Sequence, residues 1–170
     1  MKRIFLFFII TILVCVSTSA QIQRNFFDFQ LGVTTQDEVR SYLQSKGKTI
    51  NYDSNCMYVN NMRFGGETWS SAYFKFYDDI LFSVAFIQTE MTTTRKFLDN
   101  TFKHFKTNLN KKYSNYYNSK SSNDEISNYD DQVTDVLLRY SNYQGVQSLL
   151  LMYSDLETMK AIARNDVDEL

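Results

Sequence analysis

Residues 70–87 read SSAYFKFYDDILFSVAFI, and this stretch predicts an antiparallel hairpin at the centre of the fold. Aromatic and aliphatic residues alternate with polar ones on both sides of the pair Asp78-Asp79. A two-residue loop would turn one strand over relative to the other. A three-residue loop segregates the phenylalanines, and we therefore prefer it. It gives one buried face of Phe74, Phe76, Phe82, Val84 and Phe86, with Tyr73, Lys75, Tyr77 and Ser83 on the opposite face.

Helices are predicted on both sides of this hairpin. Thr35 and Glu38 have the spacing of a capping box, which predicts a short amphipathic helix from Gln36 to Lys46. Apolar residues at three- and four-residue steps predict a second helix from Thr93 to Tyr113. Ser154 and Glu157 repeat the capping pattern and predict a last helix, with Leu156, Met159, Ile162 and Ala163 inward.

The remaining segments predict further strands and one long loop. Thr49 to Asn60 is a strand that turns at Asn60-Asn61, and a following strand is interrupted by Gly65-Gly66, where glycines suggest a bulge or a close backbone approach. Val133 to Ser141 and Val146 to Ser154 form a second hairpin around residues 142–145. The polar residues 114–132 predict a mobile loop.

The order of elements is α-β-β-β-α-β-β-α, which predicts an α+β fold with an antiparallel sheet and helices on one face. Two helix–strand–strand units side by side are consistent with this order. Residues 21–170 are long enough for one core and form a single domain. The aromatic residues Phe26, Phe27 and Phe29 are expected to pin the N-terminal segment to that core.

Residues 1–20 have the three-part layout of a secretory signal peptide. Lys2 and Arg3 precede an apolar run from Ile4 to Val16, and small residues lead to a cut after Ala20. The run is shorter than the roughly 20 apolar residues of a membrane span, so an uncleaved anchor is the weaker alternative. A lipoprotein would need a small residue before Cys15, where the chain has Val14. We expect an exported protein, periplasmic or extracellular, that is not an integral membrane protein after cleavage.

The composition limits the chemistry of partners. No Asn-x-Ser/Thr acceptor occurs, which favours a bacterial origin for the exported chain. Cleavage would leave Cys56 as the one cysteine, expected as a small buried apolar residue without a disulfide. The formal net charge is -1 and no basic stripe is present, so nucleic acid is not an expected partner. No cofactor or metal site is expected.

The segment from Leu31 to Val39, with Leu43 and Gly47 after it, resembles the Gly-x-Thr opening of exported helix–strand–strand modules. These include the SmpA-type outer-membrane-assembly lipoproteins and the β-lactamase-inhibitor-protein-like fold. Phe74, Phe76, Asp78, Asp79 and Leu81 resemble the aromatic strand and turn of the same modules. The resemblance covers about a third of the chain and implies a non-enzymatic binding module. The chain departs from the pattern in having no convincing lipobox cysteine and no proline after the first helix.

No catalytic constellation is present in the sequence. His104 is the single histidine and falls on the flank of its predicted helix, without a second metal ligand nearby. The pairs Asp78-Asp79 and Asp130-Asp131 have the residue types of turns and lack the spacing of a calcium loop. We predict no catalytic residue.

Surplus aromatic residues are the one feature that indicates binding. Trp69, Tyr73 and Tyr77 are the candidate binding residues, because tyrosine and tryptophan supply rigid contact area at interfaces. Trp69 is expected in a loop that starts at Gly66. The first hypothesis is an exported protein-binding module, and the partner is an unidentified protein or glycan. The alternatives are a carbohydrate-binding module that uses the same aromatics and a hydrolase that uses Asp78 or Asp79.

Overall fold

The structure is a computed structural model that describes residues 21–54, 56–90, 96–143 and 146–168. The predicted signal peptide, the start of the second helix at Thr93 and part of the turn at 142–145 lie outside these ranges. In chain order the elements are β1 (Asn25–Phe26), β2 (Phe29–Gln30), α2 (Gln36–Ser45), β3 (Asn51–Asp53), β4 (Cys56–Phe64), β5 (Glu67–Tyr77), β6 (Ile80–Glu90), α3 (Lys96–Tyr113), the 3-10 turn η1 (Ser114–Tyr116), β7 (Ile126–Asp130), β8 (Thr134–Tyr143), β9 (Val146–Asp155) and α4 (Leu156–Asp168).

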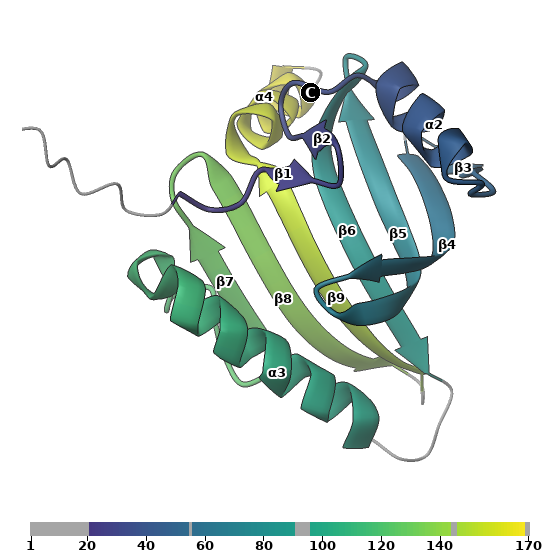
Figure 1. The fold of residues 1–170 in the computed structure, drawn as a ribbon. Helices are drawn as coiled ribbons and strands as arrows, with labels where there is room; N and C mark the ends of the chain where they lie inside the picture. Colours follow the sequence, from purple (N-terminus) through teal and green to yellow (C-terminus); the bar gives the residue numbers. More distant parts are fainter. Residues whose placement is uncertain (1–20, 55, 91–95, 144–145, 169–170) are drawn as a thin grey trace, which may run out of the picture.

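Seven strands form one antiparallel sheet in the order β3-β4-β5-β6-β9-β8-β7 (Figure 1). Helix α2 precedes the run from β3 to β6, and α3 precedes the run from β7 to β9. The last strands of the two runs, β6 and β9, pair at the centre of the sheet. The predicted α+β class with an antiparallel sheet is confirmed. Each half begins with a helix, as expected, but carries more than two strands.

The helices divide between the two faces of the sheet. α2, α3 and the small β1–β2 hairpin cover one face, which is called the core face here (Figure 1). α4 departs from the expectation that all helices share that face. Its Ile162 lies in the same hollow as Ala85 and Met152, whose chain neighbours Phe86 and Tyr153 point into the core. α4 therefore lies against one end of the opposite face.

The first helix begins as the capping box predicts. Thr35 accepts a hydrogen bond from the Glu38 amide, and the Glu38 carboxylate accepts one from the Thr35 amide at 2.8 Å. Hydrogen bonds from the Thr35 amide and hydroxyl lower the pKa of Glu38 below its ordinary value, because they stabilise the carboxylate. Val39 and Leu43 are buried against the sheet, and the helix ends at Ser45, one residue before the predicted end.

The central hairpin forms, but its predicted loop length is wrong. Asp78 and Asp79 make a two-residue turn with φ values of 46° and 66°, the pattern of a primed hairpin turn. Core-facing and outward-facing residues still alternate on both strands, because the register shifts after Lys75. Phe82 is the extra residue in β6 at this shift. Phe74, Val84 and Phe86 are fully buried in the core, as predicted. Phe82 is half-buried and faces the opposite side.

The glycine pair is a turn and not a strand bulge. Gly65 and Gly66 join β4 to β5, with φ values of 61° and 88° and with Phe64 paired to Glu67. The expected close approach is present, since a Cβ on Gly65 would lie 2.8 Å from the Phe105 ring of α3. Asn60-Asn61 is not a turn, because β4 runs through both residues.

Part of the segment predicted as a loop is a strand. β7 pairs with β8 along its whole length, and Ser127, Asn128 and Tyr129 are buried. Two of the polar side chains that suggested a loop have partners, and the Asn128 amide donates to Asp135 Oδ1 at 2.6 Å. The Tyr129 hydroxyl donates to Asn110 Oδ1 at 2.7 Å, and burial raises the pKa of Tyr129 to about 12.

The N-terminal segment is pinned to the core, as its aromatic residues predict. Ile22, Phe26 and Phe29 are buried, and Phe26 lies 4.7 Å from Tyr153 between ring centroids. The Ile22 amide donates to Asp131 Oδ2 at 2.8 Å. Burial of three large apolar side chains makes residues 22–31 a structural part of the domain.

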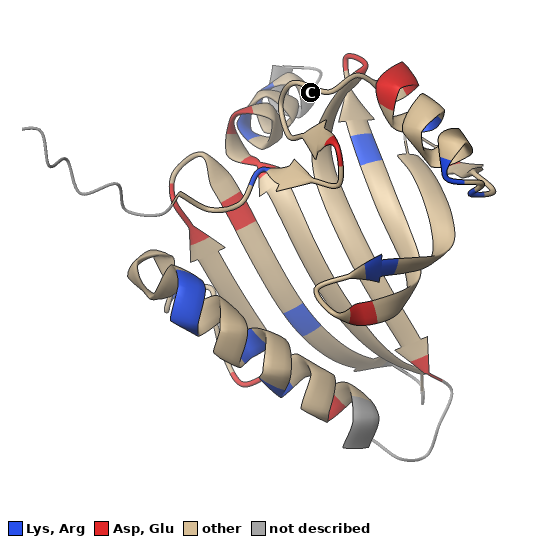
Figure 2. Cartoon of the chain, in the orientation of Figure 1, with Lys and Arg blue, Asp and Glu red and all other residues tan. Residues whose placement is uncertain are grey.

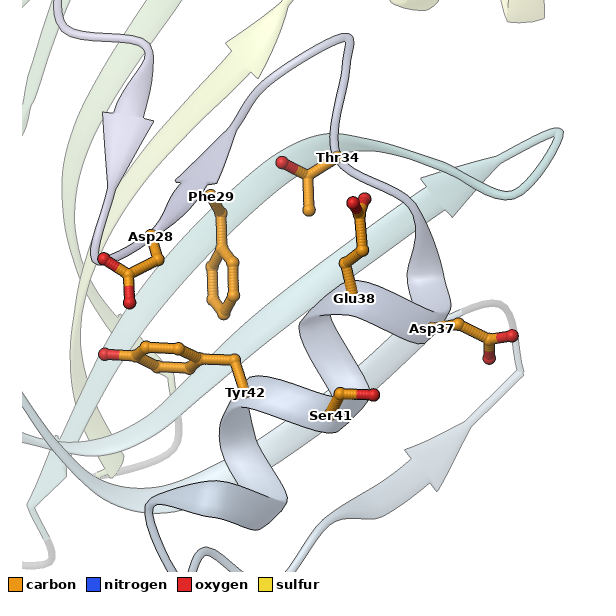
Figure 3. A pocket seen from close by; sticks show the side chains of 7 residues that line it. All are labelled: Asp28, Phe29, Thr34, Asp37, Glu38, Ser41 and Tyr42. Atoms are coloured by element: carbon orange, nitrogen blue, oxygen red, sulfur yellow. The ribbon is translucent and has the colours of Figure 1, made fainter.

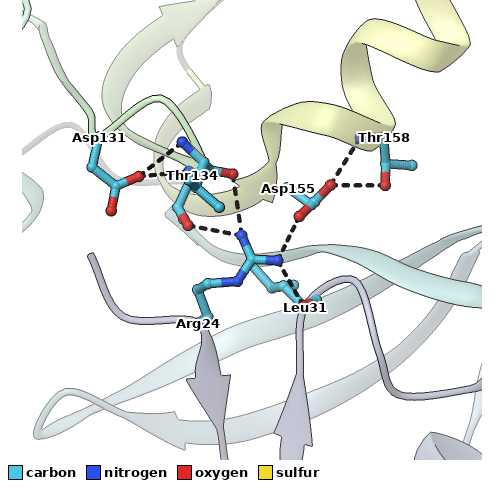
Figure 4. A network of polar contacts seen from close by, with 7 residues as sticks. Arg24, Leu31, Asp131, Thr134, Asp155 and Thr158 are labelled. Atoms are coloured by element: carbon cyan, nitrogen blue, oxygen red, sulfur yellow. Dashed lines mark hydrogen bonds and ion pairs between the residues drawn. The ribbon is translucent and has the colours of Figure 1, made fainter. Parts of the chain in front are cut away.

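Arg24 ties this segment to the start of α4 (Figure 4). Its Nη2 donates to Asp155 Oδ2 at 2.5 Å and to the Leu31 carbonyl at 2.8 Å, while Nη1 donates to Val133 and Thr134. The second oxygen of Asp155 caps α4 by accepting the Thr158 amide at 2.8 Å.

The predicted cap of the last helix, Ser154 with Glu157, is wrong, because Asp155 caps α4. The Ser154 hydroxyl bonds instead to the Ser83 hydroxyl across the sheet at 3.0 Å. The predicted inward direction of Met159 and Ala163 is also wrong, since both are exposed.

Gly32 gives a direct test of this packing. Its φ is +76°, and a Cβ there would lie 2.9 Å from Arg24 Nη2 and 3.2 Å from Asp155 Oδ2. Gly32→Ala is expected to lower the free energy of unfolding by about 2–3 kcal/mol, from left-handed strain and displacement of the ion pair. Gly47→Ala is the matched control, because Gly47 has φ +66° and nothing within 4 Å of its Cβ position. Denaturant unfolding of both variants checks this, and equal losses would contradict the role of the ion pair.

Candidate binding surface on the open sheet face

The predicted binding residues do not share one surface. Trp69 is not in a loop but in strand β5, and it is 1% exposed on the core face. Its indole lies 5.3 Å from the Phe105 ring and 5.7 Å from the Phe86 ring between centroids, and its Nε1 donates to the Phe64 carbonyl at 3.0 Å. A side chain enclosed in this way cannot contact a ligand, so Trp69 is a core residue.

Tyr73 and Tyr77 lie on the opposite face and line one hollow of about 810 Å³. The Tyr77 hydroxyl accepts a hydrogen bond from the Asn165 amide of α4. The hollow is open to solvent and mostly apolar. Its lining residues come from five strands, the turn before β4 and α4: Asp53, Ser54, Cys56, Tyr73, Lys75, Phe76, Tyr77, Phe82, Ala85, Ile87, Leu150, Met152 and Ile162.

The hollow is the deepest part of a wider apolar surface, which we call the open face. The register aligns Tyr58, Tyr73, Ala85, Met152 and Leu137 in one row across five strands. Ile87 and Leu150 pair in the neighbouring row. Of these seven residues, Ala85 is buried and the other six are half-buried. α4 covers only one end of the open face.

Strand β9 explains why this face is apolar. Leu149, Leu151 and Tyr153 point into the core, so the alternation of the strand sends Leu150 and Met152 to the open face. Strands that are apolar on both sides are typical of sheets covered on both faces. β9 is central in the sheet, between β6 and β8, but on its open-face side a further layer of the chain, α4, covers one end only.

Two aromatic rings stack at the β4–β5 side of the open face. Tyr58 and Tyr73 lie 5.1 Å apart between centroids with an interplanar angle of 21°. Burial, and then the neighbouring Tyr58, raise the pKa of Tyr73 above its ordinary value. The Tyr73 phenol is therefore neutral at physiological pH and acts as a contact surface with a polar tip.

Charged residues are few along the strands of the sheet, and the central strands carry almost none between their ends (Figure 2). Lys75 and Arg139 are exposed and alternate with buried core residues, which places both on this face. Neither side chain makes a hydrogen bond or ion pair within the ranges that the structure describes. Cys56 lies beside Lys75 in the register, its thiol donates to the Asp53 carbonyl at 2.9 Å, and burial raises the pKa of the thiol. A raised pKa disfavours the reactive thiolate.

A second hollow, of about 430 Å³, lies between α2 and β2 (Figure 3). It presents the carboxylates of Asp28, Asp37 and Glu38. Glu38 is used in the capping box, and Asp37 pairs with Arg40 on the same helix. Acidic residues in a first helical turn are favoured by the helix dipole, so the fold itself accounts for two of these three groups.

In the described ranges, no set of side chains is assembled into a catalytic site. No group of three metal-ligating side chains occurs there. Asp78 and Asp79 form the left-handed hairpin turn, which explains both residues structurally. His104 is exposed on α3, as expected, and its Nε2 lies 3.0 Å from Asn108 Nδ2.

The sequence predicts that Tyr73 and Tyr77 face away from the core, and both line the hollow, but it does not predict the other residues of the open face. Leu150 and Met152 were recognisable as outward residues of a two-sided apolar strand. Their alignment with Ala85, Ile87 and Tyr73 follows from the pairing of β6 with β9, which joins residues more than 60 positions apart in the chain.

Comparison with protein families, with curated proteins and with solved structures found no match to the chain. The resemblance to SmpA-type and β-lactamase-inhibitor-like modules therefore stays a prediction. No helix in the described part of the chain is long and apolar enough to cross a membrane.

Proposed function

We propose that this chain is a small exported bacterial protein that binds another protein through the open face and catalyses no reaction. The observation that carries the proposal is the open face itself, an apolar row that crosses five strands and is covered at one end only. Half-buried Ile87, Leu150 and Met152 lose water when a partner covers them, which favours association. Export rests on the sequence of residues 1–20.

The aromatic content of the face fits protein recognition. Tyr73 presents a neutral phenol beside Tyr58, and tyrosines at interfaces supply large contact area at small entropic cost. Methionine and leucine at the centre of the face adapt to the shape of a partner. Trp69 contributes no contact to this surface, because it faces the core.

A site-specific photo-crosslinker tests the proposal in the exporting host. A crosslinker at position 87 is expected to capture one protein partner outside the cytoplasm, and the same group at position 33 is not. Val33 is the matched control because it is 58% exposed and lies in the turn between β2 and α2, two elements that cover the core face. Leu150→Asp should abolish the crosslink at 87, and circular dichroism should show that the variant stays folded. Equal capture from both positions, or none from 87, would overturn the assignment of this surface.

The stacked pair Tyr58 and Tyr73 supports a second candidate, a carbohydrate-binding module. Exposed aromatic faces stack on sugar rings, and this pair forms a platform at the edge of the hollow. A glycan array separates the two candidates. Sugar binding that Tyr73→Ala removes and Leu150→Asp preserves would favour the carbohydrate reading, while a blank array would exclude it.

A further inference from the structure

The open face carries two exposed cations that nothing in the described chain neutralises. Lys75 stands on β5 and Arg139 on β8, and the apolar row lies between them. Asp53 on β3 is the nearest carboxylate in the row of Lys75, two strands away, and the two side chains form no ion pair. Two carboxylates at the far end of the same row are engaged elsewhere: Asp135 accepts the Asn128 amide at 2.6 Å, and Asp130 accepts the Gln132 amide at 2.5 Å. The centre of the face is therefore apolar with a positive group on either side.

We propose that the partner segment is an amphipathic helix whose apolar face is bordered by acidic residues at both ends. This inference rests on the proposed function and names the chemistry of its partner. Charge complementarity determines the charge of the partner's bordering residues. Their carboxylates would pair with Lys75 and Arg139 while the apolar face of the helix covers Met152 and Leu150. The other face of the same sheet is already covered by helices, and the open face has the same apolar character.

The positions of the two cations set the spacing of the acidic residues. β5 and β8 are separated by three strand spacings, roughly 14 Å. Arg139 aligns through Leu150 and Ile87 with Ser71, four residues from Lys75, or roughly 13 Å along the strand. The diagonal of roughly 20 Å passes over Ala85 and Met152 and equals about 13 residues of helix. Acidic residues three to four turns apart would therefore reach both cations.

Other occupants fit the charges less well. The apolar segment Ile4–Val16 of this chain is preceded by Lys2 and Arg3, which have the same sign as Lys75 and Arg139. A second copy would bring the same two cations to the interface. An acidic amphipathic helix satisfies both the apolar row and the two charges.

Two synthetic helical peptides of 20 residues test the inference by titration calorimetry on the purified protein. They share one apolar stripe and carry either glutamate or lysine at two positions 14 residues apart, about 21 Å along the helix. The acidic peptide is expected to bind about tenfold more tightly, because its two carboxylates can pair with cations that would repel the two lysines. Lys75→Glu with Arg139→Glu should invert the preference. Lys103→Glu with Lys111→Glu on α3 makes the same change in net charge on the other face and should preserve it.

The outcomes separate this inference from the proposed function. Tighter or equal binding of the basic peptide, lost in Leu150→Asp, would overturn the acidic partner and leave the open face as a binding surface. No binding of either peptide would also overturn the inference, and the crosslink at position 87 then decides the proposed function alone. A dimer in light scattering that Leu150→Asp dissociates, or capture of the protein by phosphatidylglycerol vesicles, would assign the face to a second copy or to a membrane instead.

Discussion

Replacing Asp155 by alanine is expected to lower the free energy of unfolding by about 3–5 kcal/mol, as removal of one partner of a buried ion pair does. Asp155 and Arg24 side chains are 7% and 17% exposed, so the guanidinium would stay largely buried without its counter-charge. The same substitution removes the cap that Asp155 gives to α4 through Thr158. Equilibrium denaturation with guanidinium chloride measures the loss.

The control for this prediction is Asp37→Ala. Asp37 also pairs with an arginine, but its side chain is 77% exposed, and the loss should stay below about 1 kcal/mol. A loss at Asp155 as small as that at Asp37 would show that the ion pair does not anchor the N-terminal segment.

The contribution of Asp155 also has a defined pH dependence. Burial tends to raise the pKa of Asp155, but hydrogen bonds from Thr158 and Arg24 outweigh it and lower the pKa below the ordinary 3.8. A group with a lowered folded pKa stabilises the protein fully above its unfolded pKa and loses that contribution as the pH falls through the folded pKa. The difference in stability between the parent chain and Asp155→Ala should therefore be constant from pH 7 to 5 and shrink below about pH 4.

Features set by neighbouring residues could be predicted from the sequence. The capping box of Thr35 and Glu38 depends on four consecutive residues, and the helix begins where they predict. The alternation from Phe74 to Phe86 depends on local side-chain direction, and it survived a wrong loop length because one extra residue restored the register. The pinning of the N-terminus followed from the concentration of phenylalanines at 26–29.

Features set by long-range contacts could not be predicted. β7 looks like a loop by composition because it is polar. Its Asn128 and Tyr129 side chains are buried with partners on β8 and on Asn110 of α3, and no local pattern reveals those partners. Asp155 replaces Ser154 as the helix cap because Arg24, 131 residues earlier, holds its carboxylate. The candidate site has the same limit: Tyr73 and Tyr77 were found as outward residues of one strand, but the surface exists only once β6 and β9 pair.

Trp69 illustrates that limit and gives the second large expected effect. Trp69→Ala should lower the free energy of unfolding by about 3–5 kcal/mol, the range for removing a buried large aromatic side chain. The loss combines the contacts with Phe86 and Phe105 and leaves the Phe64 carbonyl without its indole donor. Tyr73→Ala removes an aromatic ring of similar size from the open face, and because Tyr73 is half-exposed the loss should stay below about 1.5 kcal/mol.

Binding should show the opposite order of effects: Tyr73→Ala should weaken it more than Trp69→Ala does. Below its melting temperature, Trp69→Ala should keep the affinity of the parent for the acidic peptide within about twofold, because the indole lies on the face away from the partner. Tyr73→Ala should lose affinity while it keeps the melting temperature, since it removes contact area without opening the core. A Trp69→Ala protein that is as stable as the parent but binds no partner would place the binding surface on the core side and contradict the open face.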